Sequence, residues 1–125
     1  MVLDVVFSDL GAVRVITLRG EVDLATGPTL RAALLQELAD GRVRIVVNLS
    51  HLAFCDSTGL SIFARFHQQC SAEGGWLRLA APNGIVRRIL DVTGVFNDMV
   101  FDTVEAASAA PDTAPPGDPT PAGTA

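Results

Sequence analysis

The residues best suited to phosphate chemistry form one tetrapeptide, Asp56-Ser57-Thr58-Gly59. A nearly unbroken apolar run at residues 43–49 precedes it, and apolar residues at helical spacing follow it, which predicts a strand, a short turn and a helix. The N-terminus of a helix attracts negative charge, so a hydroxyl group there is well placed to accept, hold or reject a phosphate. The same residues are also typical of a simple helix cap, in which an oxygen of Asp56 or Ser57 accepts a backbone N–H.

Two further features favour a functional site over a simple cap. Gly59 falls in the first helical turn, where glycine costs about 1 kcal/mol relative to alanine, which suggests that something approaches the backbone closely. A second acidic turn, residues 20–23 (Gly-Glu-Val-Asp), follows a neighbouring predicted strand. Because such turns meet at one edge of an α/β sheet, we expect Asp23, Asp56, Ser57 and Thr58 to lie on a common rim.

The elements that must position this rim alternate along the chain. The periodicities predict strands at residues 2–7, 13–19, 43–49, 76–80 and 99–101, a loop at 20–23, and helices at 26–41, 57–72 and 84–94. In the first helix, the hydroxyl of Thr26 is the predicted cap and Pro28 lies in the first turn. This order predicts an α/β fold: a mixed sheet of four to five strands, with helices mainly on one face.

The domain is predicted to span residues 1–105. Residues 106–125 consist of Ala, Pro, Thr, Gly and Asp with one Ser and contain no large apolar residue. Such a segment cannot bury enough surface to offset its ordering entropy, which predicts a disordered tail.

Composition excludes several classes of function. The net charge is −5, and no basic run is present that would indicate nucleic-acid or membrane-surface binding. Two cysteines make no disulfide framework, and no signal peptide, metal-ligand spacing or cofactor motif is visible. We therefore expect a cytoplasmic, cofactor-free protein that is not an enzyme, with a monomer as the default state.

Three segments carry a resemblance to a known family: residues 20–23, 48–60 and 90–96. In this order and spacing they resemble the STAS domain of bacterial anti-sigma factor antagonists, and the similarity covers nearly all of residues 1–105. The resemblance implies that the unphosphorylated protein binds an anti-sigma factor that is also a serine kinase, which frees the sigma factor for transcription. It also implies that phosphorylation ends this binding and that a PP2C-type phosphatase restores it.

Carried over residue by residue, the family motif identifies Ser57 as the phosphorylation site, with Thr58 as a minor acceptor at most. The resemblance further implies a partner-binding surface formed by Asp23, Asp56, Ser57, Thr58 and Gly59.

Other interpretations of the same residues remain. STAS domains also serve as small subunits of transporter complexes, where the Asp-Ser-Thr surface would be a static contact. An enzyme with Ser57 as nucleophile is disfavoured, because neither His51 nor His67 belongs to a recognisable catalytic arrangement. Cys55 and Cys70 are expected to be about 20 Å apart on one helix, too far for a disulfide. An exposed Cys55 near a helix N-terminus would be a candidate redox sensor.

Overall fold

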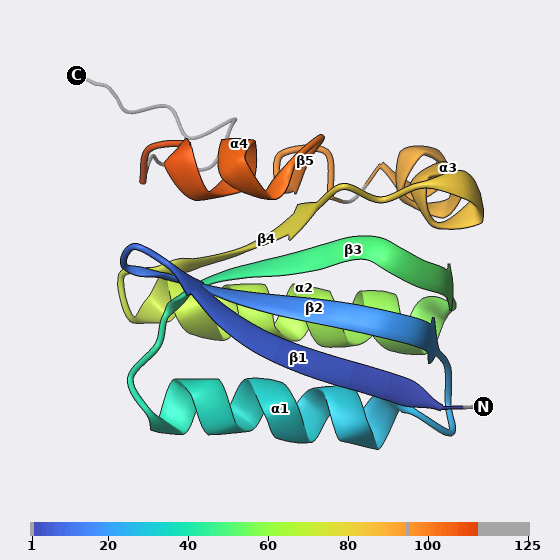
Figure 1. Cartoon of the computed structure of the whole chain (residues 1–125), viewed down its shortest axis with the longest axis horizontal. Helices are drawn as coiled ribbons and strands as arrows, with labels where there is room; N and C mark the ends of the chain where they lie inside the picture. The colour runs from blue at the N-terminus through green and yellow to red at the C-terminus, as the bar shows by residue number, and fades with distance from the viewer. Residues whose placement is uncertain (1, 95, 113–125) are drawn as a thin grey trace.

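A computed structural model describes residues 2–94 and 96–112 and contains a five-stranded mixed sheet in the order β1-β2-β3-β4-β5 (Figure 1). β1 and β2 are antiparallel, and the remaining neighbours are parallel, which confirms the predicted mixed sheet. Within these residues, no helix combines the length and apolar character needed to cross a membrane. In chain order, the elements are β1 (Leu3–Leu10), β2 (Val13–Val22), α1 (Gly27–Ala39), β3 (Arg44–Cys55), α2 (Ser57–Ala72), β4 (Trp76–Ala80), α3 (Gly84–Thr93), β5 (Val100–Phe101) and α4 (Val104–Ala109).

One face of the sheet packs against α1, α2 and α3 and forms the main core. Side chains alternate along a strand, so Ile45 and Val47 of β3 point into this core, whereas Val46 between them points to the opposite face. Phe63 and Phe66 of α2 are also buried in the main core, about one turn apart. The predicted placement of most helices on one face is confirmed.

The opposite face is covered over β3, β4 and β5 by α4 and the residues after it, which corrects the predicted start of the tail at Ala106. Ala107 of α4 is fully buried, and the guanidinium of Arg78 on β4 donates hydrogen bonds to the carbonyls of Ala107, Ala110 and Pro111 at 2.7–2.8 Å. The Arg78 guanidinium also lies 3.8 Å from the ring centroid of Trp76. Residues 106–112 therefore belong to the folded domain, whereas the rest of the predicted tail, 113–125, lies outside the described residues.

Two connections that the sequence predicts as loops are strand. β2 continues through residues 20–22 and β3 through 50–55, because the two strands keep pairing across two register shifts, as far as Val22 opposite Cys55. Gly20 permits this path: its φ is 118°, and a Cβ there would lie 2.2 Å from the carbonyl oxygen of Val2. Because β3 continues to Cys55, only Asp56 separates it from α2, and the predicted short turn between strand and helix is absent.

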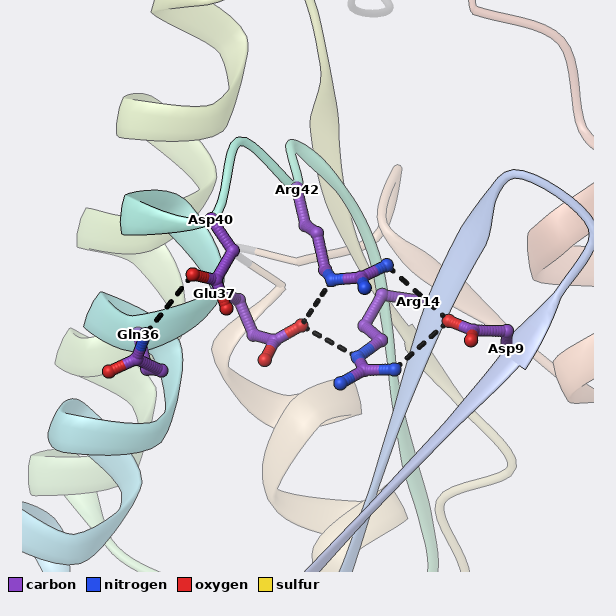
Figure 2. Close-up of polar contacts among 6 residues, drawn as sticks. All are labelled: Asp9, Arg14, Gln36, Glu37, Asp40 and Arg42. Carbon is purple, nitrogen blue, oxygen red and sulfur yellow. Dashed lines mark hydrogen bonds and ion pairs between the residues drawn. The ribbon is translucent and has the colours of Figure 1, made fainter.

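A charge network fixes α1 against the β1–β2 hairpin (Figure 2). It lies at the end of the sheet opposite the Asp-Ser-Thr motif, because Arg14 is at the start of β2 and the motif follows the end of β3. Glu37 of α1 is buried, and its carboxylate accepts a hydrogen bond from Arg14 Nε at 2.7 Å and lies 3.6 Å from Arg42 Nε. Both arginines also contact Asp9 of β1, at 3.0 and 3.5 Å. A buried charge is tolerated only when it is paired, so these contacts hold the β1–β2 hairpin against the end of α1.

Candidate functional site

The predicted rim exists at the carboxyl ends of β2 and β3. Val22 and Cys55 end these two neighbouring strands as pairing partners, and the Asp56 N–H donates to the Val22 carbonyl at 3.1 Å. Asp23 directly follows β2 and Asp56 directly follows β3, so the register brings the two acidic residues to one edge. In Figure 1 this edge is at the right, where α2 starts and the chain passes from β2 to α1.

Asp56, and not Ser57, caps helix α2. The backbone of Asp56 is extended, and its carboxylate accepts the Thr58 N–H at 2.9 Å. The sequence leaves open whether Asp56 or Ser57 caps α2, and this hydrogen bond shows that Asp56 does. Ser57 is consequently the first helical residue, and its side chain is exposed. Its hydroxyl group therefore belongs to the end of the helix where added negative charge is most favourable.

Gly59 has a structural role that differs from the predicted one. A Cβ on Gly59 would lie 2.4 Å from the Sγ of Cys55 and 2.8 Å from a methyl carbon of Val22. The close approach is therefore between α2 and the ends of β2 and β3, and Gly59 is buried. This glycine lets the start of α2 approach the sheet and so places Ser57, whereas its predicted contact with a partner stays a prediction.

Thr58 is half-buried between the two helices. Its methyl carbon lies 3.0 Å from the position that a Cβ on Gly27 would occupy, so the first turns of α1 and α2 are in close contact. This contact brings the β2–α1 connection next to Ser57.

The connection from β2 to α1 is a closed hydrogen-bonded turn. The carboxylate of Asp23 accepts the N–H groups of Ala25 and Thr26 at 2.9 and 3.0 Å. The Thr26 hydroxyl donates to the Glu21 carbonyl at 2.8 Å and accepts the Asp23 N–H at 2.9 Å. Thr26 makes no side-chain cap to α1, so the predicted capping role is wrong and the hydroxyl instead closes the turn.

These contacts also set the charge of the turn. The hydrogen bond from the Thr26 backbone, with further bonds from the Thr26 hydroxyl and Ala25, lowers the pKa of Asp23, although desolvation opposes the shift. Asp23 is therefore ionised at neutral pH. Sequence reasoning identified Asp23 but missed Thr26 as the residue that holds it.

Neither cysteine is a surface thiol. Cys55 is 1% exposed, and burial together with the charge of Asp56 raises its pKa to about 12. Cys70 is buried on α2, and burial with the charge of Glu73 raises its pKa to about 11. The hypothesis that Cys55 is an exposed, acidic redox sensor is therefore wrong. The buried thiol of Cys55 instead packs beneath the start of α2.

Comparison with known proteins identifies the family. The STAS domain model matches residues 6–107, so the chain belongs to the STAS domain family. The anti-sigma-B factor antagonist of Bacillus subtilis is 30% identical over 80 residues, which are 64% of this chain and 72% of that protein. A crystal structure of an anti-sigma factor antagonist from Mycobacterium paratuberculosis superposes with a TM-score of 0.76 at 28% identity, covering 85% of this chain and 91% of that one.

The fold alone does not decide the function. A domain of the murine solute carrier 26 family member A9 anion transporter superposes with a TM-score of 0.66 at 19% identity, covering 80% of this chain and 18% of the transporter. This likeness shows a shared fold only, so the function must be argued from the rim.

Proposed function

We propose that this chain is an anti-sigma factor antagonist whose unphosphorylated form binds an anti-sigma factor with serine kinase activity, and whose binding ends when Ser57 is phosphorylated. The observation that carries the proposal is the position of Ser57, exposed on the first residue of α2 and adjacent to the capping carboxylate of Asp56. The family membership and the names of the relatives support the partner class. In this proposal the chain is not an enzyme: the kinase is the partner, and a PP2C-type phosphatase reverses the modification.

Because of the position of Ser57, its phosphorylation is expected to change partner binding without lowering the stability of the domain. Phosphoserine adds about −1.5 to −2 charges at neutral pH. The start of α2 accommodates this charge, because the helix dipole favours it and the Asp56 cap uses the Thr58 N–H, not the Ser57 side chain. The folded domain is therefore expected to keep its structure on phosphorylation.

At the surface that binds the partner, the same added negative charge is unfavourable. In a complex, a phosphate on Ser57 would be desolvated beside the carboxylates of Asp23 and Asp56. Like charges brought together in an interface cost several kcal/mol, and a loss of about 3 kcal/mol already weakens binding more than a hundredfold. A single local charge is thus sufficient to end binding.

The test is capture from the cytoplasm of the native host with wild-type protein, Ser57→Ala and Ser57→Glu, read by mass spectrometry. We expect wild type and Ser57→Ala to retain an anti-sigma factor with a kinase domain, and Ser57→Glu to lose it. Gln68→Glu is the matched control, because it adds the same charge at an exposed position of α2, about 16 Å further along the helix.

Two outcomes would contradict the proposal. Equal capture of the anti-sigma factor by wild type and Ser57→Glu would show that this position is not a switch. Capture of the same membrane transport subunits by every variant would instead identify the chain as a static adaptor subunit.

A further inference from the structure

The rim also carries an apolar side chain that the motif does not include. Leu24 follows Asp23 in the β2–α1 turn, inside the segment that the hydrogen bonds from Ala25 and Thr26 to Asp23 close. Of its surface, 81% is exposed. Among the described residues, no other large apolar side chain is as exposed. A leucine held in water on a turn contributes nothing to the core of the free domain.

The backbone around Leu24 is held firmly on both sides. The Asp23 carboxylate accepts the N–H groups of the two residues that follow Leu24, and the Thr26 hydroxyl joins Asp23 to Glu21. A side chain presented by a preorganised turn loses little further backbone entropy when a partner covers it. This property is typical of an anchor residue in an interface.

Leu24 belongs to the turn that adjoins the proposed Ser57 surface. Asp23 and Asp56 follow paired strand ends, and the first turn of α1 contacts Thr58 of α2. A partner that covers Ser57 and Asp23 therefore meets Leu24 in the same approach.

We propose that Leu24 is the apolar anchor of this surface and that it enters a hydrophobic pocket of the anti-sigma factor bordered by a basic group that faces Asp23. The inference rests on the proposed function and adds the chemistry of the partner's contact surface. The occupant follows from the position of this turn beside the Ser57 site and from the negative charge on both strand ends, which favours a basic surface opposite.

The test measures the Kd of the purified protein for one anti-sigma kinase. This kinase is the one that wild-type protein captures from its host, produced as a recombinant protein. Leu24→Ala is expected to weaken binding by about 10- to 100-fold, the loss expected when a buried leucine side chain is truncated. Leu24→Met, which conserves volume and apolar character, is expected to bind within about threefold of wild type. Leu24 is exposed in the free protein, so the unfolding midpoints of both variants should match that of wild type.

Leu35→Ala is the matched control, because Leu35 is a second exposed leucine, 50% accessible, about 12 Å along α1 from Gly27. Its Kd should stay within about twofold of wild type. If Leu24→Ala also binds within twofold while Ser57→Glu loses binding, the anchor is refuted and the proposed function stands. If both alanine variants lose binding equally, the contact is unspecific and the anchor is again refuted. If wild type binds no anti-sigma factor of its host, both proposals fail.

Discussion

Substitution of Gly59 by alanine tests how tightly the start of α2 is seated on the sheet. The added methyl group would lie 2.4 Å from the Sγ of Cys55 and 2.8 Å from a carbon of Val22, closer than Cβ atoms approach other heavy atoms in folded proteins. The shifts that such overpacking forces on the neighbouring groups cost about 1–3 kcal/mol. Alanine offsets up to about 1 kcal/mol of this, because its helix propensity is higher than that of glycine. We therefore expect Gly59→Ala to lower the free energy of unfolding by about 1–2 kcal/mol.

The assay is urea and thermal unfolding of the purified domain. A destabilisation of this size should lower the unfolding midpoint by roughly 4–8 °C in a domain of this length. Gly27→Ala is the control, since its Cβ would meet nothing closer than the methyl carbon of Thr58 at 3.0 Å. The control should cost less than Gly59→Ala.

A second substitution identifies the atom responsible. Cys55→Ala removes the sulfur that the new methyl group would strike, so Gly59→Ala should be better tolerated in that background. The expected coupling is about 1 kcal/mol in favour of the double variant. The reasoning is refuted if Gly59→Ala is as stable as wild type, or if its cost is the same with and without the Cys55 sulfur.

Four further predictions concern the C-terminal segment, the buried thiol and the helix cap. Arg78→Met should destabilise the domain by about 2–4 kcal/mol, because the carbonyls of Ala107, Ala110 and Pro111 lose their charged donor, and proteases should then cleave residues 106–112. Equal unfolding and cleavage of Arg78→Met and of exposed Arg88→Met would contradict this. At pH 8, iodoacetamide should modify Cys55 far faster in denaturant than in the folded state, because burial raises its pKa to about 12; equal rates by mass spectrometry would contradict it. Because the pKa of Cys55 is higher in the folded than in the unfolded state, the free energy of unfolding should fall as pH rises above about 8.5, where the thiol ionises in the unfolded chain. Asp56→Ala should lose about 1 kcal/mol of stability with its cap, whereas Ser57→Glu should lose none in the same unfolding assay.

The parts of the fold that were predicted correctly depend on local signals. The bounds of α2 follow from an apolar strand, an Asp cap and helical spacing, and the structure places that helix at Ser57–Ala72 as predicted. The rim followed from two acidic turns after neighbouring strands, a rule of sheet topology that needs no side-chain detail.

The parts that were missed depend on contacts between residues distant in the chain. The segment after Val104 has no large apolar residue, yet it folds because Arg78, about 30 residues earlier, donates to its carbonyls. Glu37 has the appearance of a surface residue on an amphipathic helix, but it is buried by Arg14 from β2. Composition and periodicity cannot reveal such pairs, because each partner alone is an ordinary polar residue.

Gly59 shows how a correct signal can have a structural cause that the sequence does not reveal. A glycine that costs helix stability does indicate close approach, but the sequence cannot say from which side. The structure shows that Cys55 and Val22 approach from within, and this leaves the outer surface of the turn to Ser57. The residue that seats the helix and the residue proposed to carry the phosphate are therefore two positions apart and face opposite sides. Modification of Ser57 can then change the surface of the domain without disturbing the packing beneath it, as a switch that acts on binding alone requires.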